Sequence, residues 1–499
     1  MRGDLQQNKQ GRNVYDVIVV GGGIVGSMIA RELSKYKGRF ALVEKEPSTG
    51  FGVSKANPSM LHSAFMFPSG PLRHRLVYDA ASRYRKLAGE LDVVFNEVDE
   101  IFVALNTTQL EKLEKAQKWA EENNLPGGHR MIGAGELLEL EPHVTPKALG
   151  ALHGKGVGGI YAPEWTFALV ENAVQNGLEL YLSTEVKDIG REKDFQYDVV
   201  TSKGILGTRY LVNAAGLFVD EIARMVGDND IKLILTKGVM AILDKSVSHL
   251  VRNMVYGSYG KDHSQLVTPT AHGNILIGMG YFTCPEHKAD TGVSGEKLSE
   301  VVEMAKELIP AVSEKDVITS FAGIRSENTK AQVMGDFYIG ESEHAPGVIH
   351  AAIGSPGLTA APAIAEYVIE LLSRAGMAME EKKDFKKHRT GWRRFEEASF
   401  SEKEKMLASD PRYGHVVCRC EQVTEAEILE AIRRGADTTD AVKHLTRAGM
   451  GRCQGGFCGT GVLNYLARYM GISPTDVTKK GVGSYQVCGF TKEKRSQHG

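Results

Sequence analysis

The chain has 499 residues, of which 42% are hydrophobic and 24% charged, and its formal net charge is −2. A chain of this length exceeds a single hydrophobic core, so two or three domains are expected. The near balance of charge gives no reason to expect nucleic acid or an anionic membrane as a partner. The polar residues 1–13 lack the apolar core of a signal peptide or membrane anchor.

The first predicted elements form a dinucleotide-binding unit. Residues 17–20 are a continuous apolar run, typical of a strand buried on both faces of a parallel sheet. Three glycines follow at G-x-G-x-x-G spacing, Gly21, Gly23 and Gly26. They permit a sharp turn, a close approach to a pyrophosphate, and tight packing of helix on strand. Residues 24–35 are predicted to form that helix, whose N-terminus favours the diphosphate.

A second apolar run at 40–43 ends at Glu44. An acidic residue there is expected to accept hydrogen bonds from a ribose and to disfavour a 2′-phosphate, so NADP is not expected. The residues alone leave FAD and NAD open. The glycine-rich segment 154–159 does not follow a buried strand and is predicted to be a loop. Without a second fingerprint, one dinucleotide is expected.

Further strands are predicted at 233–243, and at 266–268 with 275–277 across a turn at 273–274. The most apolar long stretch, 348–372, contains His350, Glu366, prolines and glycines. It is predicted to be a buried loop and helix, and no membrane span is expected. Residues 376–411, rich in Lys and Glu, are predicted to be a linker with a helix, and 489–499 to be disordered.

Four of the six cysteines lie in a C-x-C and C-x4-C pattern, Cys418, Cys420, Cys453 and Cys458. Thiolates suit iron–sulfur clusters or zinc. A [2Fe–2S] cluster is the favoured interpretation, with zinc and free structural thiols as alternatives. Such cysteine use indicates a cytoplasmic redox or metal protein and not a disulfide framework. Cys284 and Cys488 lie outside the pattern and are interpreted as spare thiols.

The segment between the cysteine pairs is predicted to be helical. Residues 424–427 form a capping box before an apolar face, and Gly435 is expected to end that helix. Two more helices are predicted at 440–447 and 460–469.

Over nearly its whole length the chain resembles the A subunits of anaerobic glycerol-3-phosphate dehydrogenases. The most specific match is 446–458, TRAGMGRCQGGFC, and others lie at 213–216, 267–270, 322–325 and 347–351. The resemblance implies FAD in place of NAD. It also implies an α/β fold: a Rossmann-like FAD-binding domain of the D-amino-acid-oxidase-like superfamily, a discontinuous α+β substrate domain, and a small helical, bacterioferritin-associated-ferredoxin-like [2Fe–2S] domain.

The resemblance implies the following division of the chain. The FAD-binding domain is assigned to 14–95, 150–225 and 335–375, the substrate domain to 96–149 and 226–334, the linker to 376–411, the [2Fe–2S] domain to 412–475, and the tail to 476–499. The residues expected at FAD are Gly21, Gly23, Gly26, Glu44, Lys45, Val186, Ala215, Gly216, Gly354, Gly357, Leu358 and Thr359. Val186, at the end of a strand, is expected at the adenine, and 354–359 under the isoalloxazine ring.

One segment departs from the family. After Leu61-His62-Ser63 the arginine thought to face the phosphate is missing, and the next arginine is Arg73. This stretch is more similar to L-2-hydroxyglutarate dehydrogenases, in which Pro-Gly-x-Leu-Lys occupies the place of 69–73. If glycerol 3-phosphate is the substrate, Arg73 or Arg75 is expected to replace the missing arginine.

The resemblance implies oxidation of a small anionic secondary alcohol, with sn-glycerol 3-phosphate to dihydroxyacetone phosphate favoured. His62 is the candidate base or substrate donor, and Arg325 the anion holder. Lys237 is expected to face flavin or substrate, while His272 and His350 are weaker candidates. The alternatives are a core histidine for His62, and a structural ion pair of Arg325 with Glu327 or Asp336.

Electrons are then expected to pass through the cluster to a partner subunit, a second flavoprotein or iron–sulfur protein, in a hetero-oligomer. Three other functions stay open: an L-2-hydroxyglutarate dehydrogenase, an amino- or imino-acid dehydrogenase subunit, and a non-enzymatic flavin and iron–sulfur electron-transfer scaffold.

Overall fold

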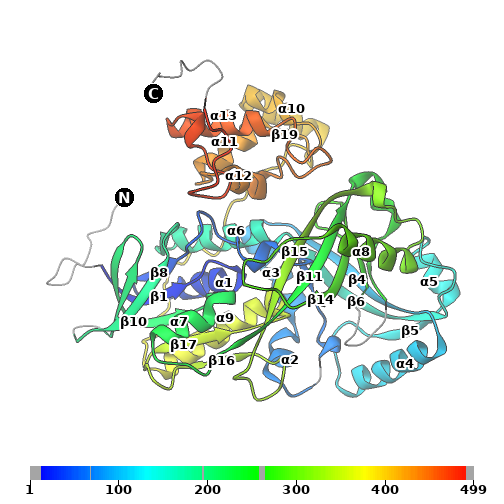
Figure 1. The fold of residues 1–499 in the computed structure, drawn as a ribbon, viewed down its shortest axis with the longest axis horizontal. Helices are drawn as coiled ribbons and strands as arrows, with labels where there is room; N and C mark the ends of the chain where they lie inside the picture. The colour runs from blue at the N-terminus through cyan, green and yellow to red at the C-terminus, as the bar shows by residue number, and fades with distance from the viewer. Residues whose placement is uncertain (1–12, 68, 194–195, 258–264, 490–499) are drawn as a thin grey trace, which may run out of the picture. The chain divides into compact units, whose positions relative to one another are not determined.

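A computed structural model describes residues 13–67, 69–193, 196–257 and 265–489 (Figure 1). The predicted disordered tail lies outside these residues, apart from residue 489. The chain divides into two compact units, one containing 49–391 with the N-terminal segment up to residue 45, the other containing 392–489 with residues 46–48. The predicted linker 376–411 is therefore divided between the units. Among the described residues, no helix has the length and apolar character needed to cross a bilayer.

The first unit contains an eight-stranded sheet within the described residues, with the order β16-β17-β10-β1-β2-β7 and with β9 and β8 continuing from β10. Its centre is parallel, because β1 (Val14–Val20) pairs in parallel with β2 (Phe40–Val43) and β10 (Gly204–Asn213). The strand β17 (Val348–Ala352) pairs in parallel with β10. The carboxyl ends of these strands therefore meet at one edge, where ligands bind in open α/β sheets. The other strands are β7 (Glu179–Tyr181), β8 (Val186–Arg191), β9 (Tyr197–Thr201) and β16 (Tyr338–Glu341).

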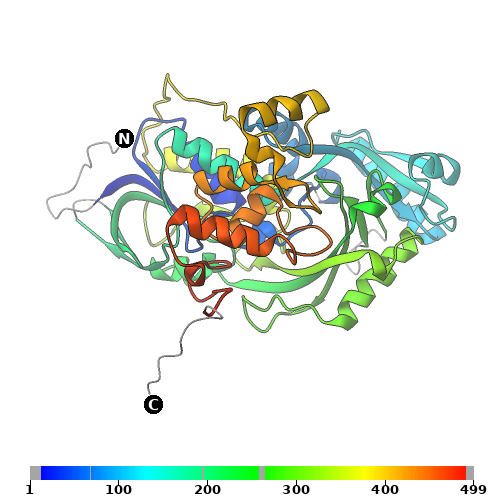
Figure 2. The same cartoon turned by 90° about the horizontal axis from the view of Figure 1, so that it is seen from above.

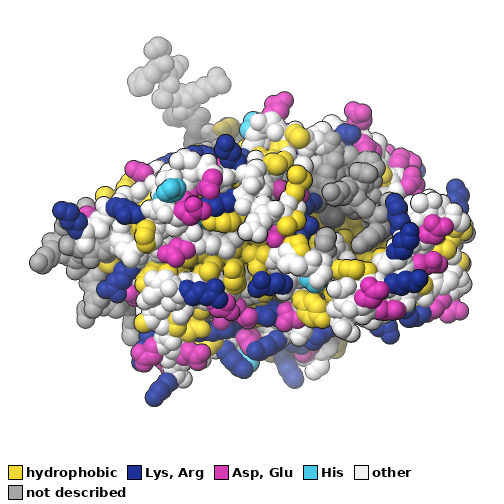
Figure 3. Space-filling view, turned by 90° about the horizontal axis from the view of Figure 1, so that it is seen from below, with side chains coloured by type: hydrophobic (Ala, Val, Ile, Leu, Met, Phe, Trp, Pro, Cys, Tyr) yellow, Lys and Arg dark blue, Asp and Glu magenta, His cyan; other side chains and the backbone are white. Residues whose placement is uncertain are grey.

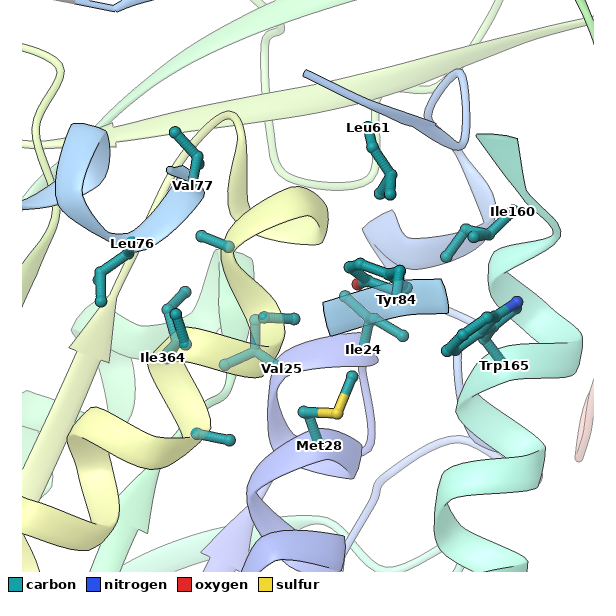
Figure 4. Packing of buried hydrophobic residues seen from close by; sticks show 14 of the residues in the cluster. Ile24, Val25, Met28, Leu61, Leu76, Val77, Tyr84, Ile160, Trp165 and Ile364 are labelled. Atoms are coloured by element: carbon teal, nitrogen blue, oxygen red, sulfur yellow. The ribbon is translucent and has the colours of Figure 1, made fainter. Parts of the chain in front are cut away.

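Three helices pack together beside this sheet: α1 (Ile24–Leu33) lies between α6 (Ala162–Gln175) and α9 (Gly357–Arg374). Figure 4 shows their side chains meeting Tyr84 of α3 (Ala80–Leu91). Trp165 of α6 is fully buried, lies 4.9 Å from the Tyr84 ring, and donates from Nε1 to the Val94 carbonyl at 2.9 Å. This cluster fixes the start of α9 relative to the sheet.

A second sheet of nine strands, counted in the described residues, has the order β15-β11-β14-β13-β12-β4-β6-β3, with β5 paired to β6. Its strands are β3 (Met60–Leu61), β4 (Phe95–Ala104), β5 (Arg130–Gly133), β6 (Gly150–Ile160), β11 (Leu233–Leu243), β12 (Met254–Tyr256), β13 (Leu266–Pro269), β14 (Ile275–Thr283) and β15 (Val317–Asn328). The strands predicted at 233–243, 266–268 and 275–277 are confirmed. The helix α8 (Gly295–Leu308) packs against β11, β13 and β14.

The prediction of a loop at 154–159 is wrong, because these residues belong to strand β6, which pairs with β4. The physical reason is the room that the glycines leave for neighbouring side chains. A Cβ at Gly154 would lie 2.6 Å from His129 Nε2, and one at Gly158 would lie 2.3 Å from the Phe95 ring. The glycines let large side chains of neighbouring elements lie across the strand. Residues 150–160 thus belong to the nine-stranded sheet.

The second unit is mainly helical (orange and red in Figure 2). Its helices are α10 (Phe400–Ser409), α11 (Glu425–Arg433), α12 (Thr439–Thr446) and α13 (Gly459–Met470), and β18 (Val416–Cys418) pairs with β19 (Val423–Thr424). The predicted capping box is confirmed, since Thr424 and Glu427 satisfy each other's backbone N–H groups. Gly435, with φ +107°, follows the end of α11.

The remaining helices of the first unit are α2 (Leu72–Val77), α4 (Thr107–Glu122), α5 (Ala134–Leu140) and α7 (Val219–Met225). The face drawn in Figure 3 carries acidic and basic side chains next to one another, as the small net charge leads one to expect.

Trp165→Ala should destabilise the first unit, because it removes the indole that supports Tyr84 and the start of α9. The expected loss in the free energy of unfolding is about 3–5 kcal/mol. Urea unfolding followed by circular dichroism measures it. Val174→Ala, an exposed position on the same helix, is the control and should change the value by less than about 0.5 kcal/mol. Equal effects of the two substitutions would contradict the supporting role of Trp165.

Candidate active site and cysteine cluster

The turn between β1 and α1 can be built only from glycine at two positions. Gly21 has φ +105°, and a Cβ there would lie 2.5 Å from the Ala214 carbonyl oxygen. A Cβ at Gly26 would lie 1.9 Å from the Gly21 carbonyl oxygen. The start of helix α1 therefore packs directly against the carboxyl end of the sheet. At Gly23 the approach is looser, with Ser54 Oγ at 3.2 Å from a Cβ.

The start of α1 suits a dinucleotide diphosphate. Its N-cap is Gly23, which provides no side-chain cap, and the Ile24 N–H donates to Ser54 Oγ at 2.9 Å. The positive end of the helix dipole at this turn favours a diphosphate. Glu44, at the end of β2, accepts from the Gly22 N–H at 2.6 Å through Oε2. This contact fixes the carboxylate beside the turn, where the ribose of a bound dinucleotide would lie. Lys45 extends the same segment and lies 3.4 Å above the Phe218 ring.

The other residues expected around the dinucleotide lie at neighbouring strand ends. The Thr184 N–H donates to the Glu44 carbonyl at 2.8 Å, which brings 184–186 beside β2. Val186 begins β8, so the expectation that this segment ends a strand is wrong. Ala215 and Gly216 follow β10, and Gly216 has φ +57°.

Two contacts hold the start of α9 near the nine-stranded sheet. A Cβ at Gly354 would lie 2.3 Å from the Ser326 carbonyl oxygen, so the loop before α9 lies directly against β15. Within that loop, the Gly357 N–H donates to the Gly354 carbonyl at 2.7 Å. The Tyr84 hydroxyl donates to the Leu358 carbonyl at 2.5 Å. The start of α9 is thus held against β15 and α3.

His62 follows the edge strand β3 and is tied to the first turn of α9. Its backbone N–H donates to Thr359 Oγ1 at 3.0 Å, and its Nδ1 lies 3.4 Å from the same oxygen. Burial, reinforced by the positive charge of Arg325, lowers the pKa of His62 to about 4. The imidazole is therefore neutral at neutral pH and can accept a proton.

Arg325 lies on β15 and forms an ion pair with Glu327, with 2.7 Å between Nη2 and Oε1. Both side chains remain partly exposed, at 24% and 29%. The ion pair weighed as an alternative role for Arg325 is thus present with Glu327. It leaves the guanidinium accessible beside His62, where a substrate anion could bind.

The sequence pattern did not single out Phe67, which joins His62 to Arg73. The centroids of the Phe67 and His62 rings are 6.0 Å apart, and the Arg73 guanidinium lies 5.1 Å from the Phe67 centroid. Arg75, by contrast, is exposed on α2. Only the fold reveals this grouping, because the contacts depend on a chain turn between β3 and α2.

Lys237 does not belong to this group. Its strand partner is Ile324, whereas Arg325 is opposite Thr236, so strand alternation places Lys237 and Arg325 on opposite faces of the sheet. Its ammonium forms an ion pair with Asp290 at 2.8 Å. The expectation that Lys237 faces flavin or substrate is therefore corrected.

The two weaker histidine candidates also lie elsewhere. His350 is fully buried on β17, with 2.7 Å between its Nε2 and Asp228 Oδ2 and 3.0 Å between its Nδ1 and Asn213 Nδ2. Burial lowers its pKa. These contacts indicate a structural role. His272 lies against the Tyr161 ring and 3.7 Å from Glu164.

In the second unit the four predicted cysteine ligands come together as two pairs. The Sγ atoms of Cys420 and Cys453 are 3.7 Å apart. The thiols of Cys418 and Cys458 form the other pair; hydrogen bonds from the Cys458 thiol and from backbone N–H groups, against the effect of burial, lower the pKa of Cys418 to about 6. Two thiolates for each of two irons is the arrangement that a [2Fe–2S] cluster requires.

The loop 449–456 supplies close backbone around these thiols. A Cβ at Gly451 would lie 2.2 Å from Cys420 Cβ. Gly449 and Gly455 have φ +91° and +90°, and a Cβ at Gly449 would lie 3.6 Å from the Gly455 Cα. Backbone N–H groups of 455–457 point at the Cys453 thiol and lower its pKa. This set of donors suits an anionic cluster.

Gly451→Ala should prevent assembly of the cluster, because the added methyl occupies the space of the Cys420 side chain. The expected result is loss of protein-bound iron and sulfide and of the reduced-state electron paramagnetic resonance signal, with FAD retained. Gly459→Ala, where a Cβ meets open space, is the control. A Gly451→Ala protein with full iron content would contradict the proposed packing.

Comparisons with known proteins agree with both sites. Residues 16–371 match the family model of FAD dependent oxidoreductases (DAO), and residues 416–468 match the BFD-like [2Fe–2S] binding domain. The second match contains all four paired cysteines. The first spans more than half of the chain, including the glycine turn, His62, Arg325 and the start of α9.

Individual relatives extend the comparison. A glycerol 3-phosphate dehydrogenase of Caloramator mitchellensis is 39% identical, over 96% of this chain and 100% of that protein. The anaerobic glycerol-3-phosphate dehydrogenase subunit A1 of Haloferax volcanii is 25% identical, over 90% of this chain and 82% of that protein. The FAD-bound, dithionite-reduced L-alpha-glycerophosphate oxidase of Mycoplasma pneumoniae has a TM-score of 0.69 and 25% identity, covering 76% of this chain and 100% of that one.

The predicted α/β FAD-binding fold with a small C-terminal iron–sulfur domain is thereby confirmed, and FAD and a [2Fe–2S] cluster are the cofactors. The chain belongs to the family of FAD dependent oxidoreductases, carries a BFD-like [2Fe–2S] binding domain, and is similar to a glycerol 3-phosphate dehydrogenase over 96% of its length.

Proposed function

We propose that this chain oxidises sn-glycerol 3-phosphate to dihydroxyacetone phosphate. The observation that carries the proposal is a neutral imidazole, His62, beside an accessible guanidinium, Arg325, at the start of α9. The first group can take a hydroxyl proton and the second can hold an anion. The dehydrogenase and oxidase relatives support this choice of substrate over other secondary alcohols.

Arg325 orients the substrate through its phosphate, since the planar guanidinium can offer two parallel N–H groups to two oxygens. His62 holds its Nδ1 proton toward Thr359 Oγ1, at 3.4 Å, which leaves the Nε2 lone pair for the hydroxyl at carbon 2. FAD, when bound, would supply the acceptor for the hydride of that carbon. The proton goes to His62 Nε2, so oxidation of the alcohol leaves a ketone and a protonated imidazole.

The N-terminus of α9 contributes electrostatics to this site. Its N-cap, Pro356, provides no side-chain cap, and the first turn carries no acidic residue. The positive end of the helix dipole therefore favours negative charge that develops near it. The contacts of Gly354 and Leu358 hold this turn in place before substrate arrives.

Cys418, Cys420, Cys453 and Cys458 would hold the [2Fe–2S] cluster, which would supply a one-electron path to a protein acceptor in a hetero-oligomer. The presence of a one-electron carrier in the same chain supports this route. The Haloferax volcanii relative is named as a subunit, which supports a partner chain. The use of cysteines as paired, reduced thiols supports a place in the cytoplasm.

An anaerobic flavin-bleaching assay tests the substrate. Purified holoprotein is mixed with sn-glycerol 3-phosphate, L-2-hydroxyglutarate or L-proline, and the absorbance of oxidised FAD is followed. Glycerol 3-phosphate should bleach the flavin rapidly, and the other two should not. Bleaching only by L-2-hydroxyglutarate or only by proline would replace the proposal with the corresponding dehydrogenase.

His62→Asn should lower the flavin-reduction rate constant by about 10²–10⁴-fold, because the proton acceptor is lost. The pKa of about 4 predicts a second result for the wild-type protein. The imidazole stays neutral as the pH falls through the ordinary histidine value of about 6.5, so the rate constant at saturating substrate should not fall there. Stopped-flow absorbance measures both. An acid limb centred near the ordinary value would contradict the neutral-base role.

A further inference from the structure

Arg73 is held at the substrate region by a carboxylate from a distant loop. Asp336 accepts hydrogen bonds from the Leu72 N–H at 2.8 Å and the Arg73 N–H at 2.7 Å, so it fixes the start of α2. It also accepts from the Phe337 N–H at 2.8 Å. The loop that follows β15 and the helix that follows β3 are thereby joined at Arg73.

The Arg73 guanidinium is half-buried and incompletely satisfied. Its Nη1 donates to the Gly335 carbonyl at 2.6 Å. Its Nε is buried and has no hydrogen-bond partner among the described residues. A buried donor without a partner costs free energy, and an incoming acceptor removes that cost.

Arg73 also lies in the electrostatic field of the Arg325 and Glu327 pair. A Cβ at Gly335 would lie 3.1 Å from Arg73 Nη1 and 3.7 Å from Glu327 Oε2, so these two groups flank the same point. Burial, together with the Arg325 charge, lowers the pKa of Arg73, against the effect of Asp336 and Glu327. Glu327 thus lies near both guanidinium groups, while Asp336 lies near Arg73 and accepts from three backbone N–H groups.

We propose that Arg73 and Arg325 together form a clamp for a phosphate dianion, with Glu327 as the counter-anion that the phosphate displaces. Arg73 is then the specificity-determining residue that takes the place of the arginine missing after residue 63. The inference rests on the proposed function, since it names the part of the substrate that the site selects. The Arg73 and Arg325 clamp is not required for the proton transfer at His62.

Shape favours phosphate over a single carboxylate. The two guanidinium groups lie near the carboxylates of Glu327 and Asp336, and an anion takes the place of Glu327 once that side chain turns toward solvent. Three phosphate oxygens can accept from both forks, whereas one planar carboxylate satisfies one fork fully. Glu327, at 29% exposed, has a path to water.

The test uses holoprotein with FAD and cluster bound, and inorganic phosphate and sulfate as probes. Binding is followed by the perturbation of the flavin absorbance spectrum. Arg73→Gln should weaken phosphate binding by at least about 10-fold, because charge-assisted hydrogen bonds are lost. Arg75→Gln, exposed on the same helix, is the matched control and should bind phosphate as the wild type does.

Two further measurements separate a clamp from a structural role. Phosphate affinity in the wild type should rise with pH as the monoanion becomes the dianion, while sulfate affinity should stay constant over the same range. In stopped-flow reduction by glycerol 3-phosphate, Arg73→Gln should raise the half-saturating concentration at least about 10-fold and leave the limiting rate constant within about 3-fold. Arg73→Lys, which keeps the charge without the fork, should fall between wild type and Arg73→Gln in both assays.

The outcomes distinguish the two proposals. If glycerol 3-phosphate does not reduce the wild-type flavin, the proposed function fails, and the phosphate titration still tests the clamp. If the substrate reduces the flavin but Arg73→Gln and Arg73→Lys bind phosphate as the wild type does, the clamp is overturned and the function stands. Loss of FAD from Arg73→Gln with normal phosphate binding by Arg73→Lys would likewise overturn the clamp.

Discussion

The contact between the backbones of Gly21, Gly26 and Ala214 is the constraint on which the flavoprotein unit depends. It brings the start of α1 against the ends of β1 and β10, and a Cβ at either glycine would lie within 2.5 Å of a carbonyl oxygen. Because the strands are parallel, every neighbouring strand end meets at this edge. Glu44, Ala215 and the loop before α9 occupy it for that reason, although they are far apart in the sequence.

Features governed by local rules could be predicted from the sequence. The buried runs of β1 and β2, the glycine turn, and the capping box of Thr424 and Glu427 all depend on short segments. The sequence also singled out the four cysteines, but the pairing of Cys420 with Cys453 and of Cys418 with Cys458 depends on the fold. The strand β6 could not be predicted, because its glycines make sense only beside His129 and Phe95, which other elements supply.

The candidate site shows the same division. His62 and Arg325 could be singled out by residue type. The fold buries His62 and places it within range of the Arg325 charge. Lys237 lies on β11, which pairs with the strand of Arg325, yet strand alternation places its side chain on the other face, where it pairs with Asp290. Arg73 lies near Arg325 and Glu327 only because Asp336 fixes α2, a contact between residues 263 positions apart. Contacts between residues so far apart in the sequence cannot be predicted from a short segment of it.

The charges in this region are coupled through His62. In the ligand-free protein, burial and the Arg325 charge both disfavour its protonation, which holds its pKa low. An anion that binds the Arg325 guanidinium offsets the effect of its charge on the pKa of His62, since Coulomb interactions are strong away from bulk water. Substrate binding therefore raises the basicity of the imidazole when the hydroxyl proton must be taken, while burial, the larger effect, still holds the pKa of His62 below the ordinary histidine value. One electrostatic interaction, between Arg325 and His62, thus links recognition of the anion to proton transfer, and a neutral alcohol of the same shape would gain neither.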